Sequence, residues 1–86
     1  MNKQDEKAVF VFLTHVLLRK IGKGYPDFFL RWMSDLTDSA QQRRVMQLRY
    51  TGDSLMKFES IALEMGISPR RVFKHHKNVV DRIIAP

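Results

Sequence analysis

The sequence predicts an all-α protein of four or five helices, and two observations indicate it. Apolar residues recur at helical spacing in each of the longer segments. Between these segments stand residues that commonly begin or end helices, notably Gly22, Pro26, Asp38 and Gly66. With 86 residues, the chain is expected to form one domain, near the lower size limit for a fold held by a hydrophobic core alone.

The composition restricts the possible functions. The chain has no cysteine, which excludes disulfides, thiolate zinc sites and cysteine nucleophiles and is compatible with the reducing cytoplasm, where we expect the protein. A net charge of +6 and a pI near 10.1 favour an anionic partner, nucleic acid before a membrane surface. Residues 8–18 form the longest apolar stretch, which is too short to span a membrane. Asp5 and Glu6 argue against a signal peptide.

We predict a first helix over residues 5–21. Its run AVFVFL could also be a buried strand, because a short apolar run is ambiguous by period alone, but the apolar pattern continues to Leu18. Arg19 and Lys20 then suit a helix C-terminus, which we expect just before Gly22.

The apolar residues of this helix cover more than one of its faces. They are Val9, Phe12, Val16 and Ile21 on one face, Phe10, Leu13 and Leu17 on another, and Val11 and Leu18 on a third. A domain this small has difficulty covering all of them. We therefore expect residues 1–35 to supply the centre of the fold or the interface of a homodimer. The lone His15 is expected to pack rather than to bind a ligand.

Residues 22–25 are predicted to form a linker turn, after which Pro26 begins a second helix that ends near Leu36. One face of this helix is apolar at helical spacing and is predicted to be core: Phe29, Trp32, Met33 and Leu36. Phe28 lies off that face and is expected to pack against the first helix.

A third helix is predicted over residues 39–50, with Asp38 as its N-cap and Gln41 at the capping-box position. Its inner face is expected to hold Ala40, Val45, Met46 and Leu48, and its outer face Gln42, Arg43 and Arg49. Residues 51–54 are predicted to form a turn. A fourth helix should begin at Ser54 or Lys57 and end at Met65.

Four consecutive residues predict a tight turn between the fourth helix and a fifth. Gly66 suits the left-handed residue that commonly ends a helix, and Ile67 can seal the corner. Ser68 is a good N-cap, and Pro69 fits the first helical position, where its missing N–H costs nothing. The sequence therefore predicts two helices joined by a turn, in a C-terminal helix-turn-helix.

The last helix, residues 68–84, divides into an apolar side and a basic side. The apolar side holds Val72, Phe73, His76, Val79, Val80, Ile83 and Ile84. Between Ser68 and Arg82 there are five Lys or Arg and one Asp, a net +4 of the +6 of the whole chain. A solvated surface helix would also have a polar face, but such helices usually mix both signs of charge. A one-sided positive surplus on the second helix of this motif favours phosphate contact and entry into a DNA groove.

Several of these residues are also found in a known family. Ile61-Ala62, Gly66-Ile67-Ser68 and the run Val72-x-Lys74-His75-x-x-Asn78-Val79 resemble the C-terminal helix-turn-helix of LuxR-type response regulators. The fourth region of bacterial sigma factors is similar. The resemblance covers residues 36–84 and implies a helical DNA-binding fold. The chain departs from the LuxR-type pattern at Arg71, in the loop over residues 51–56, and in the absence of the Arg-Glu pair of the family's opening motif.

No catalytic constellation is found in the sequence. His75 and His76 are adjacent, so on a helix they point in different directions and cannot share a metal ion. No pair of carboxylates is spaced for acid–base work, and we expect neither an enzyme nor a cofactor or metal. His76 is expected to be half-buried in the core, and His75 to lie at its edge.

The sequence thus predicts a small DNA-binding transcription regulator, with residues 36–86 as its DNA-binding part. Arg70, Arg71 and Lys74 are predicted to reach base edges, and a second group to hold phosphates, namely Ser68, His75, Lys77 and Asn78. Auxiliary phosphate contacts are expected from Arg43, Arg44, Arg49 and Lys57, for which a purely solubilising role is an even alternative. Two rival functions stay open: a module that binds RNA polymerase or another regulator, and a DNA-recognition subunit of a phage or plasmid assembly.

Overall fold

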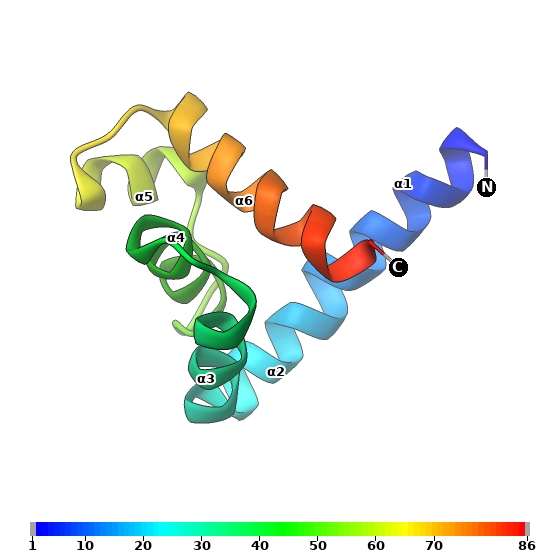
Figure 1. Ribbon diagram of the computed structural model, residues 1–86, viewed down its shortest axis with the longest axis horizontal. Helices are drawn as coiled ribbons and strands as arrows, with labels where there is room; N and C mark the ends of the chain where they lie inside the picture. Colours follow the sequence, from blue (N-terminus) through cyan, green and yellow to red (C-terminus); the bar gives the residue numbers. More distant parts are fainter. Residues whose placement is uncertain (1, 86) are drawn as a thin grey trace.

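The computed structural model describes residues 2–85 and contains five helices and no strand over that range. The first is one continuous helix made of three segments, α1 (Lys3–Val11), η1 (Phe12–Leu18) and α2 (Arg19–Gly24). The others are α3 (Pro26–Leu36), α4 (Ala40–Tyr50), α5 (Phe58–Met65) and α6 (Pro69–Ile84) (Figure 1). The all-α prediction is confirmed.

The first helix is longer than predicted and changes its winding in the middle. In η1 the chain adopts the wider π-helical turn, and the Thr14 hydroxyl donates to the Phe10 carbonyl oxygen at 2.8 Å. The Thr14 hydroxyl thereby competes for a carbonyl of the helix itself. The wider turn brings Leu13, Thr14 and Leu18 into the core, while Phe12 stays outside.

The linker turn predicted at residues 22–25 is wrong, because Gly22 to Gly24 belong to the last turn of α2. Gly22 lies against the end of α4: a Cβ at this position would come within 2.4 Å of the Tyr50 carbonyl oxygen. Arg19 reinforces this contact, since its Nη1 donates to the carbonyl oxygens of Tyr50, at 3.1 Å, and Gly52, at 2.6 Å. This glycine therefore permits two helices to approach closely rather than ending one of them.

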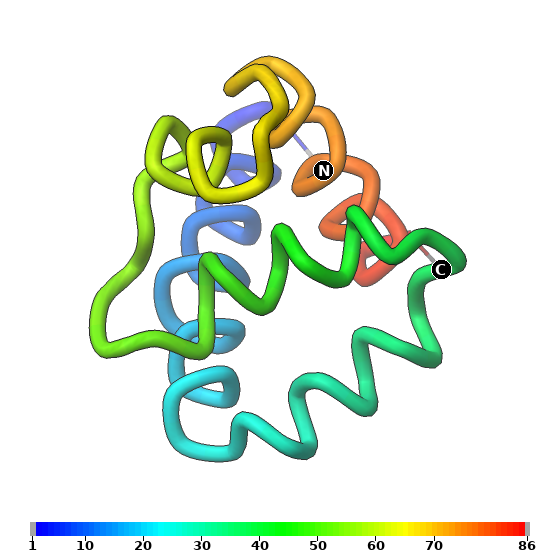
Figure 2. Tube along the Cα trace, turned by 90° about the vertical axis from the view of Figure 1, so that its left-hand side faces the viewer, coloured from blue at the N-terminus to red at the C-terminus, as the bar shows by residue number. Residues whose placement is uncertain are grey.

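The helices enclose two buried groups of side chains. The larger joins the first helix, α3, α4 and the C-terminal half of α6 through Leu13, Leu18, Phe29, Met33, Met46, Tyr50, Val79 and Val80. The smaller joins α4, α5 and the start of α6 through Val45, Ile61, Ala62 and Val72. Figure 2 shows α3 and α4 running in opposite directions beside the long first helix. The apolar face predicted for α3 is confirmed, but Phe28 is 54% exposed instead of packing on the first helix, and His15 is also exposed.

The start of α4 differs from the prediction by one residue. Ser39, not Asp38, is the N-cap, and its hydroxyl accepts from the Gln42 N–H at 3.4 Å. Asp38 instead faces Arg82 of α6, with 3.4 Å between Oδ1 and Nη1. Gln42 was expected outside but is 8% exposed, because it lies beneath the same arginine.

The predicted corner between α5 and α6 is confirmed in its backbone details. Gly66 ends α5 with φ of 68°, the left-handed conformation that a glycine adopts without strain. The Ser68 side chain accepts from the Arg71 N–H at 3.2 Å, and Pro69 opens α6. Residues 51–57 form the irregular connection before α5.

Candidate nucleic-acid interface

The inner face of α6 is fixed by buried contacts. Val72, Val79 and Val80 are fully buried, and His76 is 3% exposed. The His76 ring stacks on Tyr50 with 5.7 Å between ring centroids, and its Nε2 is 2.6 Å from the Tyr50 hydroxyl oxygen. These contacts join α6 to the end of α4 and leave the opposite side of the helix free.

Burial determines the protonation of this pair. Desolvation lowers the pKa of His76 to about 4, and the positive charges of Arg49 and then His15 add to the effect. The same burial raises the pKa of Tyr50 to about 12, partly offset by Arg49. At neutral pH both groups are therefore uncharged, and the Tyr50 hydroxyl and Nε2 of His76 share a hydrogen bond.

Two polar contacts join α6 to the segment that runs from the end of α3 to the start of α4. Near the C-terminal end of α6, Arg82 Nη1 donates to the Leu36 carbonyl oxygen at 3.2 Å, beside its ion pair with Asp38. Nearer the N-terminal end, Nε2 of His75 lies 3.1 Å from Oε1 of Gln41 at the start of α4. His75 is thus half-buried and held at the edge of the outer face.

The outer face of α6 is basic and free of acidic groups over its first three turns. Six of the seven residues predicted to contact DNA are exposed on it: Ser68, Arg70, Arg71, Lys74, Lys77 and Asn78. No Asp or Glu occurs between residues 65 and 80. The pKa of His75 is lowered first by burial and then by the charges of Arg71 and Lys74. Of these six residues, only Lys77 has an acidic partner within residues 2–85: Asp81, at 2.8 Å.

The predicted auxiliary residues differ in their availability. Arg49 was expected to point outward but faces inward: it donates to the Met56 carbonyl oxygen, and its guanidinium lies 4.9 Å above the centre of the Phe58 ring. Arg44 is exposed and lies one turn after Gln41, on the side of α4 that faces His75. Arg43 is half-buried, and Lys57 is exposed just before α5.

The sequence reasoning missed the exposed apolar residues around this surface. Leu63 on the outside of α5 is 85% exposed. Phe73 was placed on the inner face of α6 but is 53% exposed at its margin, where its ring meets Phe58 edge-on at 6.3 Å. Helical spacing alone would have placed Leu63 opposite the buried Ile61 and Ala62, so its exposure was recoverable from the sequence.

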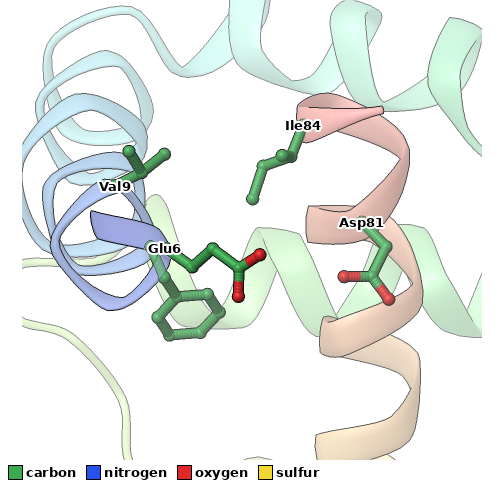
Figure 3. Close-up of a pocket in the computed structure, with 5 residues that line it drawn as sticks. Glu6, Val9, Asp81 and Ile84 are labelled. Carbon is green, nitrogen blue, oxygen red and sulfur yellow. The ribbon is translucent and has the colours of Figure 1, made fainter. Parts of the chain in front are cut away.

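A pocket of about 380 Å³ separates the start of α1 from the end of α6. It is lined by Glu6, Val9, Phe10, Asp81 and Ile84. Figure 3 shows the carboxylate of Glu6 extending from α1 into the space between the two helices, with Asp81 on the opposite wall. The pocket therefore combines an apolar floor with negative charge and is unsuited to a phosphate.

Within residues 2–85 no three His, Cys, Asp or Glu side chains lie close enough together to hold a metal ion. Over the same residues, no helix has both the length and the apolar character needed to cross a membrane. In comparisons with known proteins, no protein-family model matches the chain, and no curated protein or solved structure matches it significantly.

Proposed function

We propose that the protein is a small sequence-specific DNA-binding transcription regulator and that α6 is its recognition helix. The observation that carries this proposal is the exposed, acid-free basic face on the first three turns of α6. A helix is about 10–12 Å across with its side chains, and the major groove of DNA is about 12 Å wide. The α5–α6 pair would then act as a helix-turn-helix.

The contacts around α6 support separate roles for its exposed residues. Arg70, Arg71 and Lys74 have no acidic partner and extend from the half of the helix that would enter the groove. Lys77 and Asn78 lie further along and would meet the phosphate backbone. Because Lys77 is paired with Asp81, it would exchange that exposed carboxylate for a phosphate oxygen.

The α4 helix supports the same placement on DNA. The His75–Gln41 contact brings the start of α4 to the edge of the basic face. Arg44 would follow on that side and hold a flanking phosphate. Arg49 takes no part, because its guanidinium is committed to Met56 and Phe58.

The test is binding of the purified protein to random-sequence duplex DNA over a salt series. Each neutralised phosphate contributes a slope of roughly −0.9 to log K against log salt, so four basic side chains give about −3.6. Lys74→Ala should flatten the slope, whereas Arg31→Ala, which removes the same charge from exposed α3, should not. Absence of binding at low salt would contradict the proposal.

A second candidate function is a protein-binding module, for which RNA polymerase or another regulator is the expected partner. The 85% exposure of Leu63 favours it, because a large apolar side chain on the outside of α5 suits a protein contact. With this function, the protein would bind DNA weakly and would form a stable complex with its protein partner. Leu63→Ser would weaken that complex. A DNA-recognition subunit of a larger phage or plasmid assembly would instead show a mass above that of a dimer.

A further inference from the structure

The first helix presents an apolar outer side that no other part of the described chain covers. Lys3–Val11 contains no buried residue. Along its outer side and into η1, Val11 is 45%, Phe12 57% and Val16 48% exposed. Figure 1 shows α1 extending beyond α6, away from the other helices.

Two observations indicate that this helix has a partner. None of the nine residues of α1 is buried, and apart from the edge-on contact of Phe10 with His76 this part of the first helix gains little from packing within the chain. The accessible surface is 5953 Å², whereas a compact monomer of 10.2 kDa exposes about 5,300 Å². The excess of about 600 Å² is close to the area of about 800 Å² that one partner contributes to an ordinary interface.

We propose that a second copy of this chain covers the helix and that the two first helices pack antiparallel. Near the start of residues 3–24, Lys3 and Lys7 balance the charges of Asp5 and Glu6. The other end carries Arg19, Lys20 and Lys23 and no acidic residue, which gives it a charge of +3. A parallel pair would bring the two +3 ends together. An antiparallel pair brings each of them to the end of the other helix that has no net charge, where Asp5 lies, and also opposes the two helix dipoles.

The exposed residues fit a two-fold axis at Phe12. The groove along the outer side is lined by Gln4, Lys7, Ala8, Val11, Phe12 and Val16, and Phe12 is the most exposed of its three large apolar residues. Rotation about this position places Val16 opposite Ala8 of the second copy and Lys20 within one turn of its Asp5. The small Ala8 side chain permits close approach at the point where the larger Val16 arrives.

Self-complementarity is the reason to choose a second copy over another protein. A two-fold interface uses the same surface twice, so a stripe that is apolar in its middle and carries its excess positive charge at one end can pack on a second copy without bringing those charges together. This inference concerns the oligomeric state and does not rest on DNA binding.

The first test is the mass of the full chain in solution by light scattering across a concentration series. We expect twice the chain mass of 10.2 kDa, and a fall to the chain mass itself in Phe12→Glu. The matched control is Phe28→Glu on α3, because Phe28 is 54% and Phe12 57% exposed. The control should remain a dimer, and circular dichroism should show both variants folded.

The second test establishes the direction of packing, and the absence of native cysteines makes it clean. Ala8→Cys and Val16→Cys are prepared separately and oxidised alone and as a mixture. An antiparallel pair cross-links mainly in the mixture, whereas a parallel pair cross-links each variant with itself. Ser34→Cys on the exposed side of α3 measures random collision.

The outcomes decide the proposal. A monomer at all concentrations, a dimer unaffected by Phe12→Glu, or self-cross-linking of the single variants would overturn it. Capture of a different protein by the Phe12 surface of a monomeric chain would overturn it as well. Salt-dependent DNA binding by a monomer would refute the dimer and leave the proposed function intact. A dimer that does not bind DNA would refute the proposed function and leave the dimer intact.

Discussion

The imidazole of His76 lies between Tyr50 and Phe58, with 5.0 Å between its ring centroid and that of Phe58. The sequence placed this residue on the inner face of α6 and expected it to be half-buried, but it is almost fully buried. An uncharged histidine at this position joins α6 to the core, and a charge there would disturb the packing between them.

The pH dependence of stability should reveal this histidine. Its pKa is about 4 in the folded protein and 6.5 when unfolded, so between these values the unfolded chain binds more protons. The uncharged histidine contributes about 3 kcal/mol to the free energy of unfolding above pH 6.5, and this contribution is lost as the pH falls toward 4. Urea unfolding of wild type and His76→Gln at pH 7 and 4.5 measures it. The variant should lose less stability on acidification, and an equal loss would refute the assignment.

Arg71 should contribute to sequence preference rather than to general affinity. Its side chain is exposed in the first turn of α6 and has no acidic partner within residues 2–85. Arg71→Ala should relax preference at one base position by about 1–3 kcal/mol. Lys77→Ala should weaken all sequences alike and flatten the salt slope. Selection from a randomised DNA pool checks both, and an unchanged preference in Arg71→Ala would remove it from that role.

At the scale of the helices, α2 and the end of α4 approach each other closely at Gly22. A Cβ at Gly22 would lie within 2.8 Å of both the carbonyl carbon and the Cβ of Tyr50. Tyr50 is also the partner of His76, so this junction supports the helix that carries the basic face. The stretch Gly22 to Gly24 resembles a flexible linker in composition, but it is helical, and Gly22 packs against the end of α4.

The two glycines of α2 should respond in opposite ways to alanine. Gly22→Ala forces backbone to move and should cost about 1–3 kcal/mol. Gly24→Ala has no atom within 4 Å of the new Cβ and should be neutral or stabilising by up to about 1 kcal/mol, because alanine favours a helix. Thermal unfolding of the two variants gives the comparison. Equal effects would show that the close approach is not present in solution.

At the scale of the whole molecule, the two proposals together define the DNA site. A dimer with a two-fold axis presents two copies of α6 in opposite orientations, which read an inverted repeat. The wild type should therefore bind a full inverted repeat about 10²-fold or more tightly than a half-site, through linkage of the two contacts. Phe12→Glu should keep half-site affinity and lose this gain. Fluorescence anisotropy with the full repeat and the half-site measures these affinities. If the wild type and Phe12→Glu preferred the full repeat equally, the two copies of α6 would not be linked through the first helix.

Local chemistry in the sequence determined much of the fold. The bounds of α3, the left-handed Gly66, the Ser68 cap and the Pro69 start were all predictable, because each depends on the conformational preference of one residue or its neighbours. The basic, acid-free stretch that forms the candidate site is likewise written in the residue order. Helical spacing then identified most of the buried side of α6, including His76.

Tertiary structure alone decided features that depend on residues distant in sequence. Asp38 and Ser39 are both good N-cap residues by type. In the structure Ser39 is the N-cap, and Asp38 pairs with Arg82, which lies 44 positions away. Arg49 turned inward because Phe58 and the Met56 carbonyl stand beside it, and Gly22 stayed helical because α4 packs against it. The exposure of the first helix could not be predicted from its apolar pattern. The pattern identifies the apolar surface of the helix, but only the tertiary structure shows how much of that surface the other helices cover.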